Sequence, residues 1–112
     1  MTKGLDGCLF VYDMTEWKSF EEKLKELPMS HRDTRKFARF FLAGASQVEV
    51  DKQGRILIPN VLRDFAGLEK DVVFLGVGNR IEIWSRQAWD GEGNFDDMDD
   101  IAERMADLGL SI

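Results

Sequence analysis

The sequence predicts an α+β fold in which a small β-barrel-like core of hairpins, built from two pseudo-repeats, is decorated by helices. Short runs of alternating apolar and polar residues, typical of half-buried strands, are separated by glycine-containing turns. Between these runs lie segments with apolar residues at helical spacing. Hydrophobic residues make up 44% of the 112-residue chain, which is enough to bury the core of one small domain, and nothing indicates a second domain.

An internal repeat relates the start of the chain to its second half. Residues 2–17 align without a gap on residues 74–89, so that Trp17 corresponds to Trp89 at a separation of 72 residues. Each copy is expected to contain a glycine turn, an apolar strand and the start of a helix, with N-caps at Asp13 and Ser85. A counterpart of the segment before the second copy would fall ahead of residue 1. We therefore expect the chain to begin inside a repeat, with its first repeat incomplete.

Two helices are expected after the first copy. The first follows the Asp13 N-cap, with Glu16 placed for a capping box, and ends at Pro28. The second is expected to open at Ser30 with Asp33. One face of it is aromatic and the other basic, the basic residues being Arg32, Arg35, Lys36 and Arg39. This stripe suits phosphate contacts or an acidic neighbouring subunit; the alternative is the solvated face of an amphipathic helix.

A candidate DNA-facing loop follows at residues 51–55 (DKQGR). The alternating runs Val48–Val50 and Ile56–Ile58 on its two sides predict the strands of a hairpin. Gly54 permits the positive φ of a tight turn. Asp51 is placed to accept hydrogen bonds from loop N–H groups or from the Arg55 guanidinium, and so to fix the direction of that side chain. An arginine held in this way suits bidentate contact with guanine or a phosphate, whereas the alternative is a surface hairpin whose charges are only solvated.

The remaining elements follow in order along the chain. A short helix is expected from an Asn60 cap through Arg63, ending at Gly67. A hairpin is expected from two strands turned at Gly78-Asn79, and they cover residues 72–77 and 80–85. A last amphipathic helix is expected after an Asn94 cap, with acidic residues in its first turns that favour the positive end of the helix dipole.

Charge is unevenly distributed along the chain. The formal net charge is −6, yet residues 31–63 contain seven Lys and Arg against three acids, and so carry the basic charge around the candidate loop. From Gln87 onward there are eight acids and one base, Arg104. We expect this acidic end to be repelled from DNA and to face solvent or a basic partner. DNA binding is compatible with an acidic total charge if the positive face is continuous.

The sequence gives little support to an enzyme, a metal site or a membrane protein. His31 is the only histidine, and a capping role at a helix start explains it more simply than catalysis does. One histidine and one cysteine make a structural zinc site implausible, and no cofactor or small-molecule substrate is expected. Cys8 lies in an apolar strand and is interpreted as a buried structural thiol. No apolar run of 18 residues and no signal peptide occurs, which favours a cytoplasmic protein.

Three motifs together resemble the bacterial MraZ family. They are the DxxGR-type loop followed by a strand and Pro59, the run Gly78–Trp84 (GNRIEIW), and the run Gly4–Tyr12 (GLDGCLFVY) before a Trp-bearing helix. The resemblance covers nearly the whole chain, although the first of the family's two loops is missing and Asp13 stands where a proline is common. It implies the AbrB-like double-split barrel of swapped hairpins, a fold shared with transition-state regulators and antitoxins.

The resemblance also implies a function and a division of the chain. The single domain 1–112 would contain a remnant of the first AbrB-like repeat (1–20), connecting helices (21–46), a second repeat (47–90) and an acidic C-terminal helix (91–112). The family regulates transcription, and the resemblance implies binding to repeats in the promoter of the operon for cell division and cell-wall synthesis, as nucleoid-associated homo-oligomers that are ring-like or dimeric.

Site roles are assigned on this basis. Asp51 would organise the loop, Arg55 would make the main contact with double-stranded DNA, and Lys52 and Gln53 would contact phosphates or bases around Gly54. Weaker candidates for phosphate or interface contacts are Arg32, Arg35, Lys36, Arg39 and Arg63. The alternative function is an oligomerising protein-interaction module, antitoxin-like or an assembly subunit. The strand over residues 5–12 is expected to have an unpaired edge and to recruit a second chain.

Overall fold

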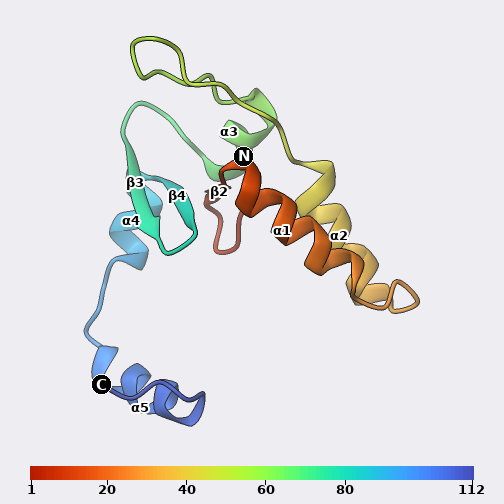
Figure 1. Cartoon of the computed structure of the whole chain (residues 1–112). Helices are drawn as coiled ribbons and strands as arrows, with labels where there is room; N and C mark the ends of the chain where they lie inside the picture. The colour runs from red at the N-terminus through yellow and green to blue at the C-terminus, as the bar shows by residue number, and fades with distance from the viewer.

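An antiparallel sheet of four strands, in the order β1-β2-β4-β3, organises the computed structural model, which describes residues 1–112 (Figure 1). The strands are β1 (Thr2–Lys3), β2 (Leu9–Val11), β3 (Val72–Val77) and β4 (Arg80–Ser85). The α+β class and the bounds of the second hairpin are therefore confirmed. The barrel-like closure is not found, because the sheet is open and no strand joins β1 to β3.

The two repeat copies meet at the centre of this sheet. Strand β2 pairs with β4 in the register Leu9↔Ile83, Phe10↔Glu82 and Val11↔Ile81. Residues 9 and 11 correspond in the repeat to residues 81 and 83, so each pairs with the counterpart of the other. The two strands are consequently related by a local two-fold axis close to Phe10 and Glu82.

The expected free edge over residues 5–12 is wrong. Strand β2 is hydrogen-bonded on both sides, to β1 and to β4, so it has no edge to offer a second chain. Leu5 does not belong to the strand but lies in the turn between β1 and β2, 52% exposed. The turn is formed by Asp6 and Gly7, both with positive φ, which folds the short β1 back onto β2.

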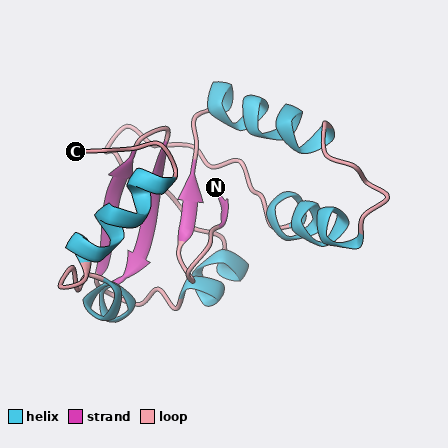
Figure 2. Ribbon diagram, turned by 90° about the horizontal axis from the view of Figure 1, so that it is seen from below, coloured by secondary structure: helices cyan, strands magenta, loops and turns pink.

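Five helices surround the sheet: α1 (Met14–Lys25), α2 (Arg32–Ala43), α3 (Asn60–Ala66), α4 (Arg86–Glu92) and α5 (Met98–Asp107). Helices α1 and α2 form an arm that extends away from the sheet, and α5 lies on the opposite side of the molecule (Figures 1 and 2). The acidic C-terminal segment thus contributes a helix that is separate from the rest of the fold.

Two predicted helix caps are confirmed. The Asp13 carboxylate accepts a hydrogen bond from the Glu16 N–H at 2.8 Å, and the Ser85 hydroxyl accepts one from the Ala88 N–H at 3.0 Å. Both bonds join a cap to the residue three positions later, at matching positions of the repeat. The Glu16 side chain does not complete a capping box; it accepts a hydrogen bond from the Asn79 amide instead.

Three other predicted helix starts need correction. Helix α2 has its N-cap at His31 rather than Ser30, with no capping bond from a side chain. Pro59 is the N-cap of α3, so that Asn60 is the first residue inside the helix, although the end at Gly67 is as expected. Helix α5 begins only at Met98, because the Asn94 side chain accepts the N–H of Asp96 in a local turn that competes with a helix.

The core is divided between the two faces of the sheet. Alternate residues of the central strands point to opposite faces, so Leu9 and Ile83 lie on one and Phe10 and Trp84 on the other. The first face is covered by the buried apolar residues of α3 and the chain after it, Leu62, Ala66 and Leu68. The second is covered by Phe41 of α2, and Cys8 lies in the same cluster, fully buried as expected of a structural thiol.

Candidate nucleic-acid interface

The segment Asp51–Arg55, here called the Asp51 loop, is closed by hydrogen bonds around one carboxylate. Oδ1 of Asp51 accepts from the N–H groups of Gln53 (2.9 Å) and Arg55 (2.8 Å). Its Oδ2 accepts from Nε of Arg55 at 3.0 Å. The backbone also closes the turn, through Asp51 N–H to the Arg55 carbonyl and Gly54 N–H to the Asp51 carbonyl. Both contacts expected of Asp51 are therefore present.

Gly54 supplies the conformation that this turn requires. Its φ is +77°, a region that residues with a Cβ adopt only with strain. The turn brings the Arg55 N–H and side chain back over Asp51, five residues forming one closed unit. The predicted role of Gly54 as the turn residue is confirmed.

The hydrogen bonds also affect the acidity of Asp51. Its pKa is lowered from the ordinary value, first by the hydrogen bond from the Arg55 backbone N–H and then by those from the Arg55 side chain and the Gln53 N–H. The carboxylate is thus ionised at neutral pH and remains able to hold Arg55. Since the group is exposed, solvent screens the ion pair, and the value of the interaction lies in orientation more than in stability.

The strands predicted on the two sides of this loop are not formed. Residues 45–50 and 55–59 are irregular, and the hydrogen bond from Asp51 to Arg55 is the last rung between them. Val48, Ile56 and Ile58 pack against the core instead. Burial of these side chains fixes the two arms of the loop separately, and no neighbouring strand is present to extend a ladder.

All five residues of the Asp51 loop are exposed. Nε is the guanidinium nitrogen that contacts Asp51, which leaves both terminal nitrogens of Arg55 directed away from the carboxylate and available as donors. Lys52 and Gln53 lie at the tip beside it and make no side-chain hydrogen bond. The geometry offers a rigid pair of guanidinium donors with a lysine ammonium nearby, which suits an anionic, hydrogen-bonding surface.

The weaker basic candidates lie elsewhere. Arg32, Lys36 and Arg39 are exposed on α2, in the arm, whereas the Asp51 loop extends from another part of the molecule (Figure 1). Arg35 donates from Nη1 to the carbonyls of Met29 and Ser30 and so stabilises the turn before α2. On α3, Nη2 of Arg63 donates to the Asn60 side chain at 2.6 Å. The structure therefore does not join the α2 stripe and the loop into one surface.

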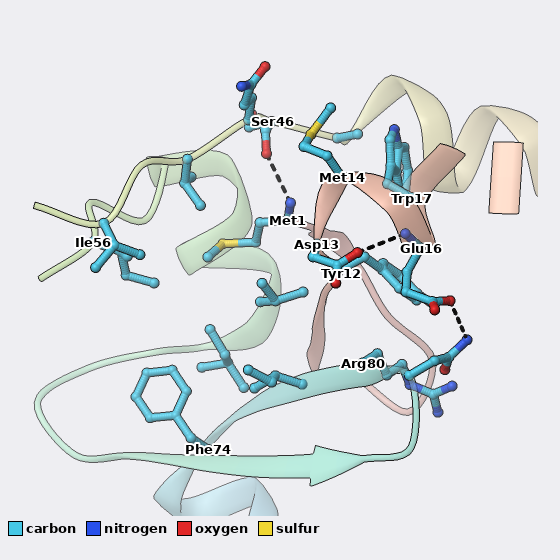
Figure 3. Close-up of a pocket in the computed structure, with 18 of the residues that line it drawn as sticks. Met1, Tyr12, Asp13, Met14, Glu16, Trp17, Ser46, Ile56, Phe74 and Arg80 are labelled. Atoms are coloured by element: carbon cyan, nitrogen blue, oxygen red, sulfur yellow. Dashed lines mark hydrogen bonds between the residues drawn. The ribbon is translucent and has the colours of Figure 1, made fainter. Parts of the chain in front are cut away.

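An apolar groove was not foreseen from the sequence. It has a volume of about 910 Å³ and lies between the irregular arms of the loop and the face of the β3–β4 hairpin (Figure 3). Exposed apolar side chains line it, among them Val50 (68% exposed), Phe74 (57%) and Ile81 (45%). The alternation Phe74, Gly76 and Gly78 along β3 is the sequence signal, since it leaves one aromatic residue on an otherwise bare strand face.

Two other kinds of site were considered for the chain as a whole. No three His, Cys, Asp or Glu side chains are grouped so that they could hold a metal ion. None of the helices has the length and apolar composition needed to cross a membrane. Burial and the negative charges of Glu82 and Asp6 raise the pKa of the Cys8 thiol to about 12, so it is protonated at neutral pH.

Comparison with known proteins gives one consistent result. The family model described as "MraZ protein, putative antitoxin-like" matches residues 1–40 and 41–108. A protein named transcriptional regulator MraZ from Thermoanaerobacter sp. (strain X514) is 55% identical over 112 residues, covering 98% of this chain and 78% of that protein. Proteins of the same name from Alkaliphilus metalliredigens and Lachnoclostridium phytofermentans are 57% and 55% identical, covering 98% and 99% of this chain and 78% and 77% of their own lengths.

Proposed function

The chain belongs to the MraZ family, and from this premise we propose that it is a DNA-binding transcriptional regulator that contacts promoter DNA through the Asp51 loop. The name of its relatives, transcriptional regulator, supports the function. The observation that carries the site is the Asp51 carboxylate, which holds both the backbone and the side chain of Arg55.

The proposed contact follows from the free donors. With Nε held by Asp51, Arg55 can present its two terminal nitrogens end-on to O6 and N7 of a guanine in the major groove. Lys52 and Gln53 then contact phosphates or neighbouring bases on either side. Arg63 is a further phosphate candidate, since its guanidinium is exposed and held by Asn60. Fixing Arg55 before binding reduces the conformational entropy that the contact costs.

One loop of five residues contacts few base pairs, so we propose that several copies act together. Specific protein–DNA complexes generally bury more surface than one such loop can offer. A dimer or ring would present identical loops at a fixed spacing and would match repeats in a promoter, with avidity raising the affinity. In this proposal the protein works on nucleoid DNA in the cytoplasm, at the promoter of the operon for division and cell-wall synthesis.

Fluorescence anisotropy with labelled promoter DNA tests the function. The fragment is taken from upstream of the protein's own gene, and a scrambled fragment of the same length is the control. We expect tighter binding to the promoter fragment, with affinity that falls log-linearly as salt rises. Equal affinity for both fragments at every salt concentration would contradict sequence-specific regulation.

The second candidate function is a protein-interaction module, and the apolar groove favours it. Exposed apolar surface of this kind is a common mark of contact with another protein. The two candidates differ in their response to salt, because a complex that buries apolar side chains is not weakened by added salt as a protein–DNA complex is. Binding that persists or strengthens with salt would favour the interaction module.

A further inference from the structure

Helix α5 has an apolar face without a partner in the chain. Met98, Ile101, Met105 and Leu108 recur at spacings of three and four residues and therefore share one side of the helix. No residue of α5 is buried, and Leu108 is 79% exposed. A short helix gains most of its stability from packing such a face, so we expect α5 to be covered when the protein functions.

The other faces of α5 and the turn before it are acidic. The six acids are Asp96, Asp97, Asp99, Asp100, Glu103 and Asp107, and Arg104 is the one base among them. A surface that covers the apolar stripe will lie close to these carboxylates. Its chemistry should therefore combine apolar side chains with positive charge.

The arm formed by α1 and α2 has that combination. Arg32, Lys36 and Arg39 are exposed along α2 at spacings of three and four residues. Apolar side chains lie exposed on the same helix, with Phe37 at 42% and Leu42 at 39%. The turn between the helices adds two more, Leu27 (44%) and Met29 (47%). Exposed apolar residues beside a basic stripe complement the acidic, amphipathic α5.

The two surfaces do not meet within one molecule. In both views the arm extends from one side of the sheet and α5 lies on the other (Figures 1 and 2). We propose that α5 of one molecule docks on the α1–α2 arm of a second copy of this chain. Each copy carries one of each surface, so the contact is head-to-tail, and repetition closes a ring or extends a filament according to the angle between copies.

This inference rests on the proposed function in that it names the surfaces of the proposed homo-oligomer. It also assigns the α2 stripe to a neighbouring acidic subunit rather than to DNA phosphates. Association is measured without DNA, so a failure of the inference is distinguishable from a failure of DNA binding.

Charge reversal on each surface, followed by their combination, tests the contact. One variant carries Arg32→Glu, Lys36→Glu and Arg39→Glu; the other carries Asp99→Lys, Asp100→Lys and Glu103→Lys. We expect each to raise the concentration for half-association, measured by light scattering, by roughly tenfold to a hundredfold, because three attractive pairs become repulsive. An equimolar mixture of the two variants should restore association, since each then offers its reversed surface to the other.

The control reverses two exposed cations outside both surfaces, Lys70→Glu and Arg86→Glu, and should leave association unchanged. Leu108→Ser removes apolar area without changing charge, and we expect it to weaken association as well. Circular dichroism checks that each variant keeps its helix content. The inference is overturned if either triple variant associates like the unmodified protein, if the mixture fails to restore association, or if the unmodified protein is monomeric at every concentration.

Discussion

Phe10 and Glu82 face each other across the β2–β4 ladder and occupy the same position in successive repeat copies, 72 residues apart. The pair marks the local two-fold axis of the sheet, and the caps at Asp13 and Ser85 follow the same symmetry. Outside the pairing the two sites differ. Glu82 accepts two hydrogen bonds from Arg80 and one from Trp84, while the Arg80 guanidinium lies 4.1 Å from the centre of the Phe10 ring.

Glu82→Ala should destabilise the protein by about 2 kcal/mol, because it leaves the half-buried Arg80 without its carboxylate. Arg80→Ala should cost a similar amount through the loss of the pair and of the Phe10 contact. The double variant should cost less than the two added together, since the interaction is then removed only once. Urea unfolding of the four proteins measures this, and strict additivity would mean that the pair contributes nothing.

Arg55→Ala should weaken specific DNA binding by about 1–3 kcal/mol if the side chain reads a guanine. The fold should be unaffected, since Arg55 is exposed and outside both core clusters. Arg104→Ala, an exposed arginine of the acidic helix, is the matched control. Anisotropy titrations with the promoter fragment provide the measurement. Unchanged affinity in the Arg55 variant would remove the loop from the proposed site.

Lys52→Ala should weaken binding to all DNA sequences alike. A phosphate contact carries no sequence information, so the ratio of promoter to scrambled affinity should stay constant. The slope of log affinity against log salt should become shallower by about one, because one fewer counterion is released. A change in the ratio with the slope preserved would indicate that Lys52 reads a base.

The Asp51 loop should be insensitive to pH over the physiological range and open only in acid. The pKa of Asp51 is lowered in the folded loop, so its contribution is present above the usual aspartate value of about 3.9 and is lost as pH falls through the lowered value. NMR of the Arg55 Nε–H across pH 8 to 2 follows the contact. Asp51→Asn should lose the charge-assisted bond at every pH, and an unaltered Nε–H signal in that variant would show that Asp51 does not hold Arg55.

Cys8 should resist alkylation in the folded protein. Burial and nearby negative charge raise its pKa to about 12, so the reactive thiolate is scarce at pH 8, and the side chain is fully covered. We expect iodoacetamide to modify Cys8 only after denaturant is added, as followed by mass spectrometry. Rapid labelling without denaturant would show that the cluster around Phe10 and Trp84 opens readily.

Local signals in the sequence determined much of the fold. The Gly78-Asn79 turn defined the second hairpin, because a two-residue turn with positive φ sets the register of both strands. The caps at Asp13 and Ser85 and the glycine end of α3 were likewise readable, since each depends on a side chain within a few residues. The contacts between Asp51 and Arg55 belong to this class as well, being separated by only four positions.

Long-range pairing was decided only by the tertiary structure. The repeat revealed that residues 9–11 and 81–83 are equivalent, but not that they pair with each other, because strand partners depend on which faces the core can cover. For the same reason the alternation at Val48–Val50 and Ile56–Ile58 predicted strands that are not formed: alternation identifies a side chain that will be buried, whereas a strand also needs a neighbour to accept its hydrogen bonds. The groove and the separation of α5 from the arm follow from that spatial arrangement, which no local spacing encodes.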